Sequence, residues 1–563
     1  MSESPTVERA RPETELSGVG IGLVAEVGVV ARMADPPPPP SAAASQEPAD
    51  VERKRARQAL AAVAADLRDR AAQAGGDAAD VLEAQALMAE DFSLAAAVEE
   101  GVKAGRTAAR AIYEAFAGYR EALAGAGEYL AARVADLDDI RNRAIAASLG
   151  LPPPGVPELP HPYVLVATDL APADTATLDL SKVVALVTVE GGPTSHTAIL
   201  ARSRGIPAMV GCAGAARLRD GDEVLVDPAH HVVVLNPEPA RVGAARAAAA
   251  AVVGSAGAVG AGATADGKAV ALLANIGGPD DVAGALAAGA EGVGLLRTEF
   301  LYLDAEHAPS VEEQEGIYRR IFTELGDRRV VVRVLDAGAD KPLAFLPVGK
   351  EPNPALGLRG IRALRAHPDI LRDQLAAIAR AQSGTSTTVW VMAPMVGEPA
   401  EAEWFVAQAR RAGLATAGVM IEVPSAALLT EEILVSAAFV SLGTNDLAQY
   451  ALAADRQLGT LAHLLDPWHP AVLRLIGISA GAAASAGKPI GVCGESAADP
   501  LLACVLVGLG VGSLSMAPTA LGAVRATLGR YTYDECVRMA GLARSAGSAA
   551  QARAVVREAA DEL

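Results

Sequence analysis

The chain has 563 residues, a formal net charge of −19 and 51% hydrophobic residues, while aromatic residues make up only 3%. This hydrophobic content excludes global disorder, and the length suits three or four domains. A chain this acidic repels phosphate backbones and anionic lipids, so we expect neither a nucleic-acid-binding protein nor a membrane-surface protein.

The cysteine pattern and the N-terminal sequence favour an intracellular location. The four cysteines form no C-x-x-C pair, which favours neither a zinc site nor a disulfide framework. The first fifteen residues mix acids and bases, and the apolar run 16–34 is interrupted by Glu26. Such a run suits buried strands better than a signal peptide or a membrane span. We therefore expect a cytoplasmic protein.

The N-terminal region changes character twice. Residues 17–33 alternate glycine with branched apolar residues, which predicts one or two short strands. Five consecutive prolines at 36–40 cannot lie inside a helix or a central strand and predict a loop. Alanine, leucine, glutamate and arginine at helical spacing over 51–149 predict a bundle of about four helices. A proline-rich stretch then sets a boundary near residue 150.

A small α/β domain follows the bundle. Residues 163–236 contain short β-rich segments separated by helical ones. If the strands before the bundle join the same sheet, segments 1–33 and 150–236 form one domain and the bundle 34–149 is an insertion. Residues 237–267 are alanine-rich and then glycine-rich, which predicts a helix followed by a flexible tether.

The last segment, 268–563, repeats a strand–helix rhythm eight times, which matches a (β/α)8 barrel. The predicted fold class is therefore multidomain α/β, a small α/β domain with an inserted helical bundle followed by a barrel. Charged and polar residues follow the predicted strands, at the end where barrel active sites are built. They include Arg297, Arg333, Asp336, Glu422, Asn445, Asp446, Cys493 and Glu495.

One histidine has the surroundings of a nucleophile. In GGPTSHTAILAR, a glycine pair ends a strand, Thr194 or Ser195 can cap the next helix, and His196 falls in its first turn. A helix N-terminus favours neutral imidazole and can hold an anionic phosphoryl group. Both properties suit a histidine that carries phosphate. The alternative is a histidine that only packs within a turn.

Seven strings in one order carry a family resemblance. They are GGPTSHTAILAR, GVGLLRTEFLY, RVLDAGADKP, NPALGLRGIR, GVMIEVPSAA, SLGTNDLAQYALAADR and GVCGESAAD. Together they resemble Enzyme I of the bacterial phosphotransferase system, a phosphoenolpyruvate–protein phosphotransferase, from about residue 17 to the C-terminus. The resemblance implies transfer of phosphate from phosphoenolpyruvate to His196 and then to the phosphocarrier protein HPr. Pyruvate is released, as the first step of sugar uptake.

The resemblance also assigns roles to residues of the barrel. Arg297, Arg333 and Arg456, with Asn445 and Asp446, match substrate-binding residues, and Arg359 matches a further arginine of the site. Arginine forks suit a substrate that carries a phosphate and a carboxylate. For any single arginine, the alternative is a surface ion pair.

Two carboxylates and one thiol complete the expected site. Glu422 and Asp446 match the ligands of Mg²⁺, which prefers hard oxygen donors, although Asp446 could instead cap a helix. Cys493 matches the residue that delivers a proton to the enolate carbon, although a buried cysteine often only packs. The family further implies that HPr docks on the helical bundle and that the barrels form a homodimer.

Two other hypotheses remain open on the sequence. The first is an enzyme of the dikinase or synthase type that lacks its nucleotide domain. No G-x-x-x-x-G-K-[ST] loop occurs, and only about 150 residues precede the α/β domain, so no nucleotide-binding domain is expected. The second is a non-catalytic regulatory relative, against which the intact set of charged residues and Cys493 argues.

Overall fold

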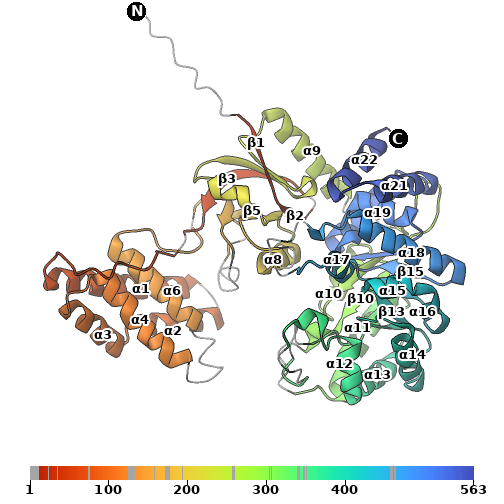
Figure 1. Cartoon of the computed structure of the whole chain (residues 1–563), viewed down its shortest axis with the longest axis horizontal. Coiled ribbons are helices and arrows are strands. Elements are labelled where there is room, and N and C mark those ends of the chain that lie inside the picture. Colours follow the sequence, from red (N-terminus) through yellow and green to blue (C-terminus); the bar gives the residue numbers. More distant parts are fainter. Residues whose placement is uncertain are drawn as a thin grey trace, which may run out of the picture. The chain divides into compact units, whose positions relative to one another are not determined.

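The structure is a computed structural model that describes residues 12–562 apart from short segments (Figure 1). The segments outside the description are residues 23, 35, 74–76, 125–133, 158, 171–177, 180, 193–194, 256–259, 303–304, 306, 339–342, 347–348, 350, 457–460 and 462–463. The chain divides into two compact units. One unit is Met1–Glu26, Glu190–Cys212 and Leu225–Leu563, and the other is Val27–Val189 and Ala213–Val224.

An eight-stranded sheet has the order β1-β8-β7-β3-β4-β5-β6-β2. Its strands are β1 (Thr14–Ser17), β2 (Val19–Ile21), β3 (Glu26–Arg32), β4 (Tyr163–Ala167), β5 (Val183–Thr188), β6 (Ala208–Val210), β7 (Glu223–Asp227) and β8 (Val232–Leu235). Strands β3 and β4 are parallel, with Val30 opposite Val164, although the whole helical bundle separates them in the sequence. The α/β fold class expected for this region is confirmed.

Two N-terminal strands, β2 and β3, lie within 17–33, as expected, and a further strand, β1, precedes them at Thr14–Ser17, which the sequence did not predict. The reason is that β1 lies at the sheet edge and buries only Leu16, so it lacks the apolar run that predicts a strand.

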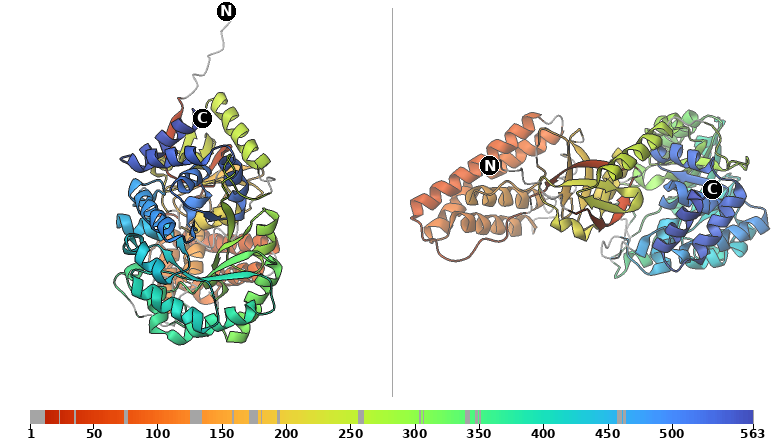
Figure 2. Two further views of the ribbon diagram at one scale, coloured as in Figure 1. Left: turned by 90° about the vertical axis from the view of Figure 1, so that its right-hand side faces the viewer. Right: turned by 90° about the horizontal axis from the view of Figure 1, so that it is seen from above.

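The helical bundle is described as five helices between residues 49 and 149 (Figure 2). They are α1 (Ala49–Gln73), α2 (Asp77–Ala89), α3 (Phe92–Lys103), α4 (Ala108–Ala124) and α6 (Val134–Leu149). Their shared core includes Leu60, Val63 and Leu67, the residues at helical spacing. The buried Glu52 side chain accepts a hydrogen bond from the Ala108 backbone N–H at 2.9 Å, which caps the start of α4.

Two further helices follow in chain order. Helix α8 covers His196–Arg204 and α9 covers Pro239–Ser255. Helix α9 lies within the segment expected to be a helix followed by a tether, but residues 256–259 of that tether are outside the described residues. The boundaries of the four predicted segments remain predictions. Among the helices of the described chain, none is both long and apolar enough to cross a membrane.

The C-terminal region is a closed barrel of eight parallel strands in the order β10 to β16, closed by β9. The strands are β9 (Ala271–Ile276), β10 (Gly292–Arg297), β11 (Arg329–Arg333), β12 (Thr388–Ala393), β13 (Ala417–Ile421), β14 (Val440–Leu442), β15 (Ile490–Val492) and β16 (Ser513–Met516). Each of the eight strand–helix repeats predicted over 268–563 supplies one of these strands, so the (β/α)8 barrel is confirmed.

Helices surround the barrel strands in Figures 1 and 2. They are α10 (Asp281–Ala287), α11 (Val311–Leu325), α12 (Ile361–Ala366), α13 (Pro368–Gln382), α14 (Pro399–Arg411), α15 (Pro424–Leu428), α16 (Thr430–Ser436), α17 (Thr444–Leu452), α18 (Pro470–Ala486), α19 (Pro500–Gly508), α20 (Leu521–Leu528), α21 (Tyr533–Ser545) and α22 (Ala549–Asp561). Their buried apolar side chains form one continuous core with the outward-facing residues of the strands.

Strand β11 shows how the barrel interior is layered. Val330 and Val332 pack in the outer core, whereas Val331 belongs to a separate buried cluster inside the barrel. Because side chains alternate along a strand, Arg329 and Arg333 face the interior as well, at opposite ends. The cluster around Val331, here called the apolar layer, separates these two ends. It consists of Leu295, Val331, Met392, Met420, Phe439 and Cys493.

Candidate active site

The predicted nucleophile lies at a helix start, as the sequence indicated. Gly191, after β5, has a positive φ of 91°, which glycine adopts without strain. The Ser195 hydroxyl oxygen accepts a hydrogen bond from the Ala198 backbone N–H at 3.3 Å, so Ser195 caps the helix that begins at His196. The His196 side chain lies outside the described part of the structure, and its proposed role stays a prediction.

Two arginines end neighbouring barrel strands. Arg333, the last residue of β11, pairs with Glu299 and with Asp336, whose Oδ2 lies 3.2 Å from its Nη1. Burial alone lowers its pKa, but Glu299 and Asp336 hold the pKa of Arg333 above its usual range.

Arg297, the last residue of β10, is different, because it has no ion pair or hydrogen bond with any described residue. Burial, and then the charge of Arg333, lower the pKa of Arg297. The charges of Glu299 and Glu495 act on Arg297 from a distance and favour its charged form, but neither is within ion-pair distance of it in the described structure.

A third arginine is fully buried between two carboxylates. Arg359 lies 3.3 Å from Asp336 through both Nε and Nη2, and it lies 3.1 and 3.2 Å from the two oxygens of Asp446. Its Nη1 also donates to the Tyr450 hydroxyl at 3.1 Å. Arg456 approaches Asp446 more loosely, at 3.5 Å. Asp446, in the first turn of α17, is thus held by two arginines.

Glu422 has an unsatisfied oxygen. It follows β13 and is fully buried, and its Oε1 accepts a hydrogen bond from the Met395 backbone N–H at 2.6 Å. Its Oε2 is also buried but has no hydrogen-bond partner among the described residues. Burial, and then the charges of Asp446 and Asp336, raise the pKa of Glu422 to about 7.

The backbone beside Glu422 leaves room for that oxygen. A Cβ added to Gly443 would lie 2.6 Å from Oε2, so only glycine fits there. An unpaired carboxylate oxygen in a buried site, with Asp446 close enough to raise its pKa, fits a divalent cation. Within the described residues, no group of three or more His, Cys, Asp or Glu could hold a metal ion. Mg²⁺, however, is commonly held by one or two carboxylates together with water and substrate phosphate.

Cys493 follows β15 and lies in the apolar layer below these charged residues. Its thiol donates to the Leu442 carbonyl oxygen at 3.6 Å. Burial is the main cause that raises the pKa of this thiol to about 11, so it is protonated at neutral pH. The charges of Arg333 and Arg297 act on it in the opposite direction and would stabilise a thiolate.

The remaining predicted residue, Asn445, has a positioning contact. Its side-chain oxygen accepts a hydrogen bond from the Glu495 backbone N–H at 3.0 Å, which joins the ends of β14 and β15. The sequence did not single out Glu299, Tyr450 or Asn275, whose amide donates to the Cys493 carbonyl oxygen at 3.1 Å. The only feature of the sequence that could have indicated Glu299 is its position two residues after Arg297.

Comparisons with known proteins assign the parts of this chain to one family. Family models match residues 256–533 as the PEP-binding domain of PEP-utilising enzymes, 159–231 as their mobile domain, and 16–133 as their N-terminal region. A "Phosphoenolpyruvate-protein phosphotransferase" of Streptomyces coelicolor is 55% identical over 96% of this chain and 98% of its own length.

More distant relatives carry the same name. One from a Bacillus species is 37% identical over 86% of this chain and 87% of its own length. Another, from Haloferax volcanii, is 37% identical over 92% of this chain and 94% of its own length. The resemblance to Enzyme I is therefore confirmed, and the chain belongs to the phosphoenolpyruvate-protein phosphotransferase family.

Proposed function

We propose that this chain transfers the phosphoryl group of phosphoenolpyruvate to His196 and then to HPr, and releases pyruvate as the first step of sugar uptake. One observation supports this most directly. The same barrel mouth holds Arg297, a cation with no direct ion pair to a described residue, and Glu422 Oε2, a carboxylate oxygen without a donor among the described residues. A substrate with two anionic groups, bound together with a divalent cation, would satisfy both.

The substrate would lie against the arginines at the strand ends. Arg297 is free to take an anionic group, and Arg333 adds a second fork beside it. Arg456, which pairs with Asp446 at 3.5 Å, would add a third guanidinium to this set. Asn445 and Asp446 form the wall after β14. Phosphoenolpyruvate, with its phosphate and carboxylate, suits this set.

A metal is typical of PEP-utilising enzymes, and we propose Mg²⁺ on Glu422 and Asp446. The unsatisfied Glu422 Oε2 and the space beside Gly443 support this choice. When bound, Mg²⁺ neutralises negative charge on the phosphate and on the departing enolate oxygen. Asp446 would then share its oxygens between the metal and the two arginines that hold it.

The protein's own residues would carry the chemistry. A ring nitrogen of His196 attacks phosphorus, so a P–N bond forms as the P–O bond to enolpyruvate breaks. The enolate carbon takes the thiol proton of Cys493, and a C–H bond forms to give pyruvate. Arg297 and Arg333 stabilise the thiolate that remains until water returns the proton. The buried setting of Cys493 excludes water from the carbon before that step.

Two protein partners belong to the proposal. Phe92 and Leu87 of the helical bundle are 87% and 59% exposed, and such apolar side chains support docking of HPr there. On the barrel, Phe300, Leu356 and Leu358 are exposed in segments that follow β10 and β11, and they support a homodimer through the barrel. A cytoplasmic location is also part of this proposal.

The test is to incubate the chain with Mg²⁺ and ³²P-phosphoenolpyruvate, and then to add HPr. Acid-labile and base-stable label should appear on the chain and pass to HPr without any nucleotide. Label that forms or moves only with ATP or AMP would instead indicate a dikinase or synthase. No label on a well-folded chain would indicate a regulatory relative, and sedimentation velocity with and without substrate would report the dimer.

A further inference from the structure

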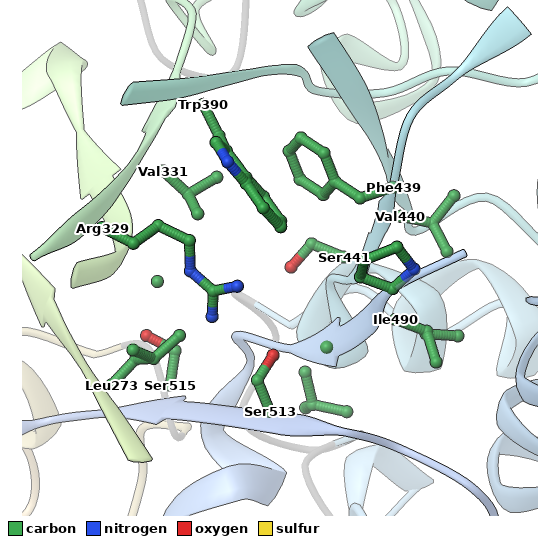
Figure 3. A pocket seen from close by; sticks show the side chains of 14 residues that line it. Leu273, Arg329, Val331, Trp390, Phe439, Val440, Ser441, Ile490, Ser513 and Ser515 are labelled. Carbon is green, nitrogen blue, oxygen red and sulfur yellow. The ribbon is translucent and has the colours of Figure 1, made fainter. Parts of the chain in front are cut away.

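A small cavity with a mostly apolar lining lies inside the barrel, at the end opposite the site described above. It has a volume of about 30 Å³ and is lined by the first residues of several strands, among them Arg329, Val440, Ile490 and Ser513 (Figure 3). Arg329 and Arg333 are four positions apart on β11, which is about 13 Å along a strand. The apolar layer fills the space between them, so this cavity is no part of the substrate site.

The cavity contains an arginine without a counter-ion. The guanidinium of Arg329 points into the space between Ser441, Ser513 and Ser515 (Figure 3). Its Nε is buried and has no hydrogen-bond partner, and it forms no ion pair within the described chain. Glu291 is near enough to favour the charged form, but its Oε1 already accepts the backbone N–H groups of Gly262 and Leu272, each at 2.9 Å.

An aromatic side chain fixes the orientation of this arginine. The guanidinium carbon of Arg329 lies 4.5 Å from the ring centroid of Trp390, a cation–π distance. Trp390 is held in turn by Phe439, at 4.6 Å between ring centroids. Stacking satisfies the face of the guanidinium, but the buried Nε–H of Arg329 still lacks an acceptor.

The serine hydroxyl groups that line the cavity can donate further hydrogen bonds into it. Ser515 donates its hydroxyl to Asn275 Oδ1 at 2.6 Å, whereas the Ser513 hydroxyl has no partner in the described structure. A Cβ on Gly491 would lie 2.3 Å from Ser513 Oγ, so glycine keeps the room in which this hydroxyl sits. The cavity therefore offers a cation and a hydroxyl donor, with no carboxylate in its lining.

We propose that this cavity binds a single monatomic anion of the size of chloride, held by Arg329 and Ser513. The volume holds one particle of about the size of a water molecule, which excludes phosphate and carboxylic acids. A water molecule would satisfy the geometry but not the charge, and a buried Nε–H without an acceptor destabilises the fold. The bound anion would stabilise the folded barrel, because it binds the folded state alone.

The first test measures thermal unfolding of the full chain while chloride replaces isethionate at constant ionic strength. All three tryptophans, Trp390, Trp404 and Trp468, lie in the barrel, so tryptophan fluorescence reports its unfolding. We expect Tm to rise by about 2–4 °C and then to saturate with chloride. Phosphate should not reproduce this rise.

Matched variants locate the effect. Arg329→Gln should abolish the chloride-dependent rise, and Ser513→Ala should weaken the apparent affinity several-fold. Arg328→Gln removes the same charge from the neighbouring exposed residue and should behave as the wild type. A rise that survives in Arg329→Gln, or that phosphate reproduces, would overturn the proposal.

A direct measurement needs no variant. Crystals grown in sodium bromide should show an anomalous peak within hydrogen-bond distance of Arg329 Nε and Ser513 Oγ. If Arg329→Gln does not fold, this peak together with the Ser513→Ala titration decides the question. Absence of the peak in wild-type crystals would mean that water alone fills the cavity, and the proposal would be wrong.

Discussion

Replacement of Arg359 by methionine tests the electrostatic core of the barrel mouth. The side chain of Arg359 is fully buried, and it bridges Asp336 and Asp446 through four contacts of 3.1–3.3 Å. Methionine has a similar length but no charge. The variant would therefore leave two buried carboxylates without the cation that they share.

The structure gives the size of the expected effect. Removal of one partner from a buried ion pair costs about 3–5 kcal/mol. Here Asp336 keeps Arg333 at 3.2 Å and Asp446 keeps Arg456 at 3.5 Å, so each carboxylate retains one cation. We therefore expect the lower end, a loss of about 3 kcal/mol in the free energy of barrel unfolding, or about 6–12 °C in Tm.

Urea unfolding of the full chain, followed by tryptophan fluorescence, measures this loss in the barrel. The matched control is Arg372→Met, because Arg372 pairs with Asp369 and Asp373 on the exposed surface, with 67% of its own side chain accessible. Exposed pairs contribute little, so the control should lose less than about 1 kcal/mol. Asp336→Asn in the Arg359→Met background should recover part of the stability.

The outcome that contradicts this reasoning is specific. If Arg359→Met unfolds within about 1 kcal/mol of the Arg372→Met control, the buried network does not stabilise the barrel. The same conclusion follows if Asp336→Asn destabilises the wild type and the Arg359→Met variant equally, because the two side chains would then not be coupled.

The other predictions concern the chemistry. His196→Ala should abolish labelling by ³²P-phosphoenolpyruvate with an unchanged circular dichroism spectrum, and normal labelling would refute its role. Arg297→Met should lower kcat/KM for phosphoenolpyruvate about 100-fold, which corresponds to one lost charge-assisted hydrogen bond, while exchange of phosphate with HPr stays normal. Cys493→Ala should slow pyruvate formation and remove the stereospecificity of protonation, and wild-type pyruvate formation would exclude the thiol. Because burial raises the pKa of the Cys493 thiol from 9.0 to about 11, its contribution to stability is complete below pH 9 and is lost toward pH 11. Between pH 9 and pH 11, the free energy of unfolding should therefore fall less in Cys493→Ala than in the wild type, as measured by parallel urea titrations. Equal losses would contradict the raised pKa.

Much of the barrel could be predicted from the sequence, because each strand is a short apolar run that ends in a charged or polar residue. The segment VVVRVLDAG overlaps β11 and PIGVCGE contains β15, so Arg333 ends its strand and Cys493 directly follows its strand. Closure of the barrel then brings these ends together without further information. The N-terminal edge strand β1 was missed in part, since its mostly exposed residues carry no apolar signal.

Charge pairing within the site could not be predicted. The sequence placed Arg297, Arg333 and Arg359 in one site, but it gave no reason why Arg297 lacks an acidic partner while Arg359 has two. Pairing depends on rotamers and on which side chain reaches across the barrel, and the periodicity of the strands does not encode this. Arg329 likewise follows an ordinary loop in the sequence, and only its position at the start of β11 turns it inward.

The apolar layer has a consequence for the catalytic cycle. Leu295, Val331, Met392 and Met420 pack with Cys493 in the apolar layer, and the Ser441 hydroxyl is the polar group that links the thiol toward the opposite end. Because one hydroxyl between apolar side chains is a poor path for protons, we expect a thiolate formed when pyruvate is made to recover its proton through the mouth by which pyruvate leaves. We therefore expect product release and thiol recovery to occur in one opening event. The steady-state rate should then be lower in D₂O than in H₂O, because reprotonation of the thiol accompanies product release, even where the chemical step is fast.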